Sequence, residues 1–255
     1  MISASAVLIT IPLSHYCEKA RWALDWVALP YREQPHAPLM HRLATQRNRG
    51  GSVPVLIHDG RCFTDSAAIL GYADEIRGGG LLYPREAERR QEVAALEQQF
   101  DAQLGPHVRR WAYGELLSRP KLLRSTWSRG VPRLEASLLP LITPLTRHLV
   151  RATYKITPES AERSLERVRG IFAQVDQRLH DGRGYLTGDR FTAADLTFAA
   201  LAAPALFPPG YRGVLPELDA MSATMRDEVS RLRITAAGQF ALRLFAVERE
   251  TKGIA

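Results

Sequence analysis

Cysteine is scarce in this sequence: Cys17 and Cys62 are its two cysteines in 255 residues. Two thiols cannot staple a chain of this length, so a disulfide scaffold is excluded and a reducing compartment is expected. Long hydrophobic runs are also missing, since the apolar stretch 198–207 has about ten residues and a membrane span needs about 20. We therefore expect a cytoplasmic protein with no membrane partner.

The amino terminus lacks the features of a secretory signal. Its apolar run, 6–11, is short, and Pro12 ends it. No Lys or Arg precedes the run, and the small residues 4–6 lie before it, whereas a cleavage site comes after the apolar region. These features favour the cytoplasmic expectation.

Metal-binding motifs and a surplus of negative charge are absent as well. The seven histidines are scattered, without an H-E-x-x-H pair or a paired Cys/His array, so no metal site is expected. Lys and Arg total 34 against 27 Asp and Glu, a net charge of +7 that favours anionic partners. The basic residues form no long tract, and no recognition helix or aromatic-basic motif accompanies them. We therefore expect no nucleic-acid partner.

Strand-like and helix-like patterns alternate in the first third of the sequence. A β-branched apolar run at 6–11 suits a buried strand, and helical apolar spacing follows Ser14 until Pro30. The Asp59-Gly60 pair signals a hairpin between two further strand patterns. The expected order is β-α-β-(α)-β-β-α, with strands at 6–11, 31–35, 53–58 and 61–63, a first helix after Ser14 and a last helix capped by Asp65 or Ser66.

After Pro84 the apolar residues follow a helical period. Residues 93–104 form one amphipathic stripe, which we expect Gly105-Pro106 to kink or interrupt. Thr157-Pro158 supplies the cap and the first-turn proline of another helix, and a final helix is expected over 236–250. This change of pattern predicts an α/β domain over 1–82 and an all-α domain over 83–255.

Two further segments of the helical half have distinct patterns. Residues 191–196 have the spacing of a capping box with a hydrophobic staple, in which Asp195 reaches back to the Thr192 N–H while Phe191 packs on Leu196. Residues 118–156 are rich in Pro and Arg around short apolar pieces. The pattern does not locate the ends of any helix there.

Ser14 and Cys17 stand where a buried strand gives way to a helix. A helix start carries unpaired N–H groups and a partial positive charge, so it favours an anion such as a thiolate. Ser14 is placed to donate a hydrogen bond to a bound thiolate, and Cys17, one turn in, is expected to ionise more easily than a free thiol. The alternative is that Ser14 only caps the helix and Cys17 fills the core.

Two other features of the first domain suit a bound peptide. Pro54 has no N–H and fits the start of a strand, and a cis bond before it would turn the backbone N–H and C=O of Val53 outward. Asp65 and Ser66 lie at a second helix start, whose N–H groups and serine hydroxyl can hold a carboxylate. An ordinary N-cap is the alternative there.

Together these residues resemble the thioredoxin-fold domain of the cytosolic glutathione S-transferases, in a bacterial-type form with Ser-x-x-Cys at the first helix. The resemblance rests on the segment 14–24, on the Val-Pro-Val-Leu strand at 53–56 and on the Asp-Ser turn. The segment 185–195 is similar to the family's capping-box segment in its helical domain. The resemblance thus covers both halves and is thin at 105–156.

The resemblance implies roles for individual residues. Ser14 takes the place that meets the glutathione sulfur, Val53 pairs its backbone with the cysteinyl part of glutathione, and Pro54 is the cis-proline. Asp65 and Ser66 hold the γ-glutamyl end, whereas Thr192 and Asp195 serve folding. The sequence departs from the family pattern in having His15 where Pro is frequent and Asp65 where Glu or Gln is frequent.

The resemblance implies a transferase that stabilises the glutathione thiolate for attack on a small hydrophobic electrophile. Glutathione is then the co-substrate, no metal is needed, and the protein is a homodimer with a role in detoxification. His15 or Arg21 is a candidate for holding the glutathione carboxylates, and 118–156 is expected to form a modified substrate pocket or an interface. Two alternatives stay open: a non-catalytic or regulatory binding protein, and a glutathione-dependent thiol reductase that uses Cys17.

Overall fold

A four-stranded mixed sheet forms the core of the N-terminal region of the computed structural model, which describes residues 6–48 and 50–250. The central β1 runs parallel to β2 and antiparallel to β3, which is antiparallel to β4. The strands, in the spatial order β2-β1-β3-β4, are β1 (Ala6–Thr10), β2 (Tyr31–Pro35), β3 (Val55–His58) and β4 (Arg61–Phe63). All four predicted strands are confirmed, although β3 begins after Pro54, which has no N–H to donate to a ladder.

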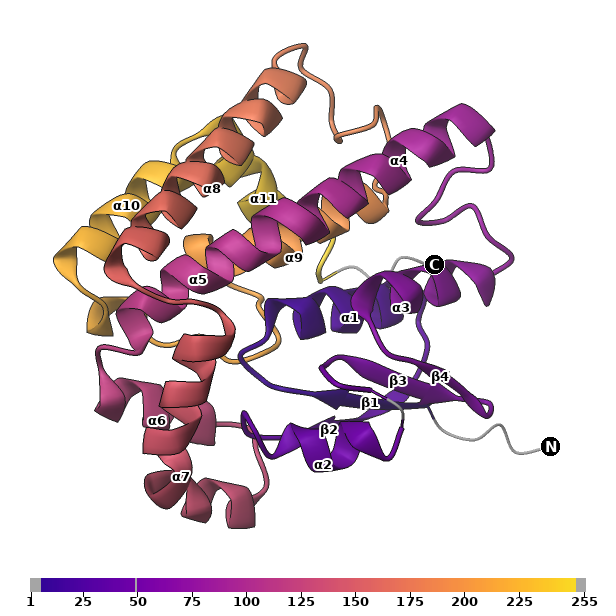
Figure 1. Ribbon diagram of the computed structural model, residues 1–255. Helices are drawn as coiled ribbons and strands as arrows, with labels where there is room; N and C mark the ends of the chain where they lie inside the picture. Colours follow the sequence, from indigo (N-terminus) through magenta and orange to yellow (C-terminus); the bar gives the residue numbers. More distant parts are fainter. Residues whose placement is uncertain (1–5, 49, 251–255) are drawn as a thin grey trace.

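Three helices complete this thioredoxin-like region, as the predicted order requires. In Figure 1, α1 (His15–Trp26) and α3 (Ser66–Glu75) lie on one face of the sheet and α2 (His41–Gln46) on the other. The sheet is therefore covered on both sides, which suits the buried strands β1 and β3.

The rest of the described chain is helical, which confirms the expected fold class. In Figure 1 the helices α4 and α5 form one long rod, and a π-helical turn, Phe100–Leu104, lies directly before Gly105. Gly105-Pro106 therefore marks a change of helical geometry. The helices are α4 (Ala87–Gln99), α5 (Gly105–Leu116), α6 (Pro120–Ser128), α7 (Arg133–Thr153), α8 (Pro158–Leu179), α9 (Ala193–Leu206), α10 (Ala223–Arg233) and α11 (Ala236–Val247), with a 3-10 turn at Leu218–Ala220.

Helix α9 is the centre of the helical region, and every one of its residues is buried. The predicted capping box at its start is confirmed: the Asp195 carboxylate accepts from the Thr192 N–H at 2.8 Å and from the Thr192 hydroxyl at 2.7 Å. It also accepts from the Leu186 N–H at 2.7 Å. Since α9 packs against α1, this cap supports the helix that carries the candidate site.

Buried ion pairs fix α1 against its surroundings. Lys19 Nζ lies 2.9 Å from Glu97 Oε1 on α4 and 2.6 Å from Asp101 Oδ2. Arg249, near the carboxyl end of the chain, lies 2.8 Å from Glu18 Oε1. Removing one member of a buried pair leaves an uncompensated charge, so these contacts hold α1 in one position.

The segment 118–156 forms α6 and α7. Pro140 and Pro144 lie inside α7, which is why its helical pattern was hard to read from the sequence. Its outer face exposes several leucines: Leu134, Leu138, Leu141, Leu145 and Leu149. In residues 6–48 and 50–250, no helix combines the length and the apolarity that crossing a bilayer requires.

Candidate glutathione site

A cleft of about 120 Å³ opens at the amino end of α1. Its walls come from both regions of the chain, so the site lies between the sheet domain and the helices. The lining residues are Ile11, Leu13, Ser14, His15, Tyr16, His41, Ser52 and Val53 from the N-terminal region, with Arg109, Tyr113 and Tyr154 from the helical region.

Ser14 is the N-cap of α1, and its Oγ accepts from the Cys17 N–H at 3.3 Å. That bond uses an oxygen lone pair and leaves the hydroxyl proton for another acceptor. The first-turn N–H groups of α1 also give this end of the cleft a partial positive charge. Ser14 is thus suited to donate a hydrogen bond to an anion in the cleft.

Cys17 lies behind Ser14 and is fully buried. Burial raises the pKa of its thiol, and the lowering effects of Arg21 and of the hydrogen bond to Ser14 only partly offset this. Of the two interpretations of Cys17, a thiol that ionises more easily than a free one and a residue that fills the core, the structure agrees with the second. The loss of water around the sulfur is the largest effect on this pKa.

Val53 lines the cleft, and its peptide bond to Pro54 is cis, as the resemblance implies. Asp65 and Ser66 begin α3, where Asp65 Oδ1 accepts from the Ala68 N–H at 2.8 Å. Asp65 is exposed and Ser66 is buried. Neither lines the cleft itself, so a ligand in contact with both Ser14 and this turn has to extend beyond the cleft.

His15 and Arg21 are the two residues considered for the glutathione carboxylates. Burial, helped by the nearby Arg109, lowers the pKa of His15 to about 3, so its imidazole is neutral at physiological pH. Its Nε2 donates to the Gly105 carbonyl oxygen at 3.1 Å, since a carbonyl can only accept. Arg21 is buried and paired with Glu33 at 2.7 Å. Neither residue therefore offers a free positive charge, and the structure gives no support to either candidate for holding the glutathione carboxylates.

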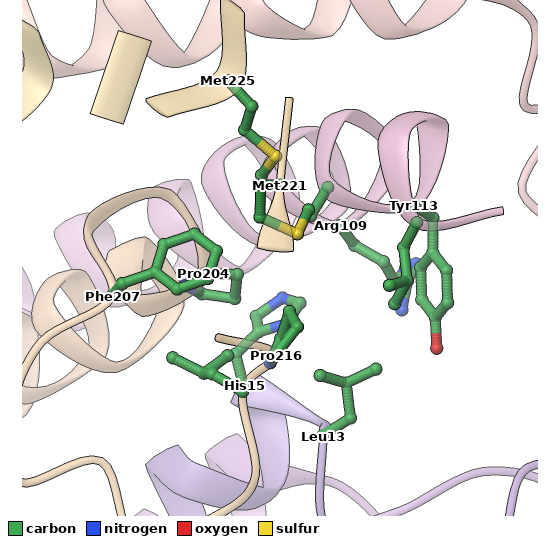
Figure 2. A pocket seen from close by; sticks show the side chains of 12 residues that line it. Leu13, His15, Arg109, Tyr113, Pro204, Phe207, Pro216, Met221 and Met225 are labelled. Carbon is green, nitrogen blue, oxygen red and sulfur yellow. The ribbon is translucent and has the colours of Figure 1, made fainter. Parts of the chain in front are cut away.

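A second, narrower cavity of about 40 Å³ adjoins the cleft and is mostly apolar. Figure 2 shows its side chains, among them Met221 and Met225 across from His15 and Leu13. The two cavities share Leu13, His15, Arg109 and Tyr113.

The helical-region residues of the site were missed by sequence reasoning. The Arg109-Arg110 pair reads as surface charge, and the position of Tyr154 depends on the path of α7. The apolar pattern indicates which face of a helix is buried, but not which part of that face meets the other domain. Within the described part of the chain, no group of three His, Cys, Asp or Glu side chains is placed to hold a metal.

Two family models match the chain, and they agree with this geometry. Residues 8–80 match the glutathione S-transferase N-terminal domain, and residues 158–228 match the glutathione S-transferase C-terminal domain. The chain belongs to the glutathione S-transferase family. No curated protein sequence matches it significantly.

Solved structures with a similar fold include several members of this family. A glutathione S-transferase of Ceriporiopsis subvermispora in complex with glutathione is 17% identical, with a TM-score of 0.63 over 97% of this chain and 98% of that chain. Glutathione transferase GSTFuA3 from Phanerochaete chrysosporium is 16% identical, with a TM-score of 0.62 over 98% of both chains. The beta-etherase LigF from Sphingobium sp. strain SYK-6 is 18% identical, with a TM-score of 0.58 over 94% of this chain and 99% of that chain. These likenesses show the fold.

Proposed function

We propose that this protein is a glutathione transferase that stabilises the glutathione thiolate and adds it to a small hydrophobic electrophile. The observation that carries the proposal is the Ser14 hydroxyl, which lines the cleft at the start of α1 and whose oxygen already accepts from the Cys17 N–H. The family and the glutathione complex of a similar fold support glutathione as the co-substrate.

In this proposal glutathione lies across the amino ends of two helices. Its cysteinyl backbone pairs with Val53 beside the cis Pro54, and its γ-glutamyl end reaches Asp65 and Ser66 at the start of α3. This orientation directs the sulfur toward Ser14 and the partial positive charge of α1.

Ser14 and the helix start then lower the pKa of the bound thiol. A free thiol has a pKa of about 8.5, so only a few per cent is thiolate at neutral pH. Lowering it by about two units makes most of the bound thiol reactive, which requires about 1.4 kcal/mol of selective stabilisation per unit. Because the pKa of His15 is about 3, the imidazole is a weak base and the thiol proton leaves to water.

The alternative of a thiol reductase based on Cys17 finds no support in the site. Cys17 is fully buried, its pKa is raised, and it does not line the cleft. A non-catalytic binding protein uses the same glutathione contacts without turnover, so assays must separate binding from transfer. The homodimer, the cytoplasmic location and the detoxification role remain predictions of the family resemblance.

The test is the conjugation of glutathione to chlorodinitrobenzene by the wild type, Ser14→Ala and Ser14→Thr. We expect Ser14→Ala to lower kcat/KM about tenfold to a thousandfold, in the range seen when a donor to a developing anion is removed. Ser14→Thr keeps a hydroxyl and should retain most of the activity. Glutathione binding by a wild type without turnover would favour the non-catalytic alternative.

A further inference from the structure

Arg109 is a cation without an acidic partner at the junction of the two cavities. The buried Arg21 and Arg249 are each paired with a glutamate, at 2.7 and 2.8 Å. Arg109 forms no ion pair with a described residue. Its Nε is buried and has no hydrogen-bond partner among the described residues. Its guanidinium lies over the Tyr154 ring at 3.9 Å, which orients the group without neutralising it.

The walls of both cavities leave this charge uncompensated. No Asp or Glu is among the described residues that line either of them. The two histidines in these walls are His15 and His41. Burial lowers their pKa to about 3 and about 4, so both are neutral at neutral pH. Among the described residues that line these two cavities, the Arg109 guanidinium therefore provides the positive charge that a bound ligand contacts.

The apolar cavity beside Arg109 suits the body of such a ligand. Its apolar lining includes Pro204, Phe207, Met221 and Met225 (Figure 2). At about 40 Å³ it is too small for an aromatic ring as it stands. The two methionines are flexible and polarisable, so they can move aside for a flat apolar group.

We propose that Arg109 is a specificity residue that binds a carboxylate on the electrophilic substrate, while the apolar part of that substrate enters the Met221–Met225 cavity. This inference rests on the proposed function. A planar guanidinium can donate two parallel hydrogen bonds to a carboxylate, and pairing there relieves an uncompensated charge. The preferred substrates are then aromatic or aliphatic electrophiles that carry an anionic group.

The probes are a matched pair: a chloronitrobenzoate with chlorine ortho to the nitro group and para to the carboxylate, and the corresponding benzamide. In each reaction the glutathione sulfur forms a C–S bond, the C–Cl bond breaks, and chloride leaves with the bonding pair. The thiol proton goes to solvent, and nothing is oxidised or reduced. The pair differs in charge at one ring position.

The variants are Arg109→Met, which keeps the side-chain length without the charge, and Arg109→Lys, which keeps a charge without the planar fork. Arg163→Met is the matched control, since Arg163 is exposed on α8 and lines neither cavity. Thermal unfolding confirms that each variant is folded. The kcat/KM for each probe and the KM for glutathione are then measured.

The carboxamide withdraws electrons from the ring more strongly than the carboxylate, so the benzamide is intrinsically the more reactive probe, and each kcat/KM is divided by the rate constant of the uncatalysed reaction with glutathione. For the wild type and Arg163→Met we expect this corrected value to be about tenfold higher with the benzoate, the effect of one charge-assisted interaction. The decisive quantity is the change in the benzoate-to-benzamide ratio between variants. Arg109→Met should lose the preference by lowering the benzoate value alone, and Arg109→Lys should keep part of it. An unchanged ratio in Arg109→Met overturns the proposal. If kcat/KM falls equally for both probes and the KM for glutathione rises, the proposal is also overturned, because Arg109 would then bind glutathione.

A binding experiment separates this inference from the proposed function. Nitrobenzoate and nitrobenzamide lack the leaving group, and calorimetry measures their binding to the wild type and to Arg109→Met with glutathione present. Binding selective for the benzoate and dependent on Arg109 supports the anion site even if neither chlorinated probe turns over. If both chlorinated probes are turned over but the two unreactive compounds bind equally well, Arg109 does not bind a carboxylate on the substrate. The transferase function then still stands.

Discussion

The Nε2 atom of His15 lies 3.1 Å from the carbonyl oxygen of Gly105, 90 residues further along the chain. This bond joins the residue after Ser14 to the first residue of α5, the helix that carries Arg109. A second hydrogen bond joins the same two regions, since the Tyr16 hydroxyl donates to the Asp101 carbonyl oxygen at 2.9 Å. The serine and the arginine are thus held in one arrangement across the domain boundary.

Gly105 permits this close approach, because a Cβ at that position would lie 2.2 Å from Tyr16 Oη. We expect Gly105→Ala to destabilise the protein by about 1–3 kcal/mol, the usual effect of overpacking, and to lower its melting temperature. Gly170→Ala is the control: Gly170 is in helix α8, and a Cβ there meets nothing within 4 Å. That change should be neutral or slightly stabilising. Equal melting temperatures of the two variants would contradict the contact.

His15 should make the protein less stable in acid. Its pKa is lowered to about 3 in the folded state from 6.5, chiefly by burial and then by Arg109, so the unfolded state binds the proton first. The stabilising contribution is present above pH 6.5 and is lost as the pH falls toward 3. We expect His15→Gln to flatten the fall in unfolding free energy between these limits by up to about 1.4 kcal/mol per pH unit.

Denaturant unfolding at a series of pH values measures this slope. His180→Gln is the control, since His180 is exposed. His41, whose pKa is also lowered, and Asp195, whose pKa burial raises to about 6, titrate in all of these proteins, so the comparison isolates His15. Parallel curves for the wild type and His15→Gln would show that His15 does not contribute.

Asp195 should be important for stability through the cap of α9. Asp195→Ala leaves the buried N–H groups of Leu186 and Thr192 without an acceptor, and we expect a loss of about 2–5 kcal/mol. Asp227→Ala removes an exposed carboxylate from α10 and should change the unfolding free energy by less than about 0.5 kcal/mol. Chemical denaturation of both variants gives the comparison.

Cys17 should be dispensable for transfer. Its thiol is buried with a raised pKa, so Cys17→Ala should keep kcat/KM within about twofold provided the small cavity it leaves is tolerated. Melting temperature is measured alongside turnover to separate the two effects. Loss of turnover in a variant as stable as the wild type would return a chemical role to Cys17.

The sequence was most informative where local chemistry determines structure. The β-branched run of β1, the hairpin at Asp59-Gly60 and the cap of α9 all depend on neighbouring residues, and each was predicted. Helix α10 was missed although Met225, Val229 and Leu232 are buried at helical spacing, because three apolar positions among five charged residues form only a short pattern. The full length of α7 was hidden by its two internal prolines.

The candidate site was only half predictable, for a related reason. Ser14 and Val53 line the cleft and were singled out because each lies at the end of a regular element, whereas Asp65 and Ser66 at the start of α3 do not line it and their role stays a prediction. Arg109 and Tyr154 join the site through domain packing, which no local pattern specifies. For Cys17 the sequence left two interpretations open, an easily ionised thiol and a core residue, because a local pattern does not show the burial that raises its pKa.

The central claim is tested most directly by titrating the thiol of bound glutathione. Thiolate absorbs in the ultraviolet, so difference spectra of saturated complexes against pH give its pKa in the wild type and in Ser14→Ala. We expect a wild-type value about two units below the free value of about 8.5, and a return toward the free value in Ser14→Ala. A bound thiol that titrates like free glutathione in the wild type, or equally low in both proteins, would contradict the role given to Ser14.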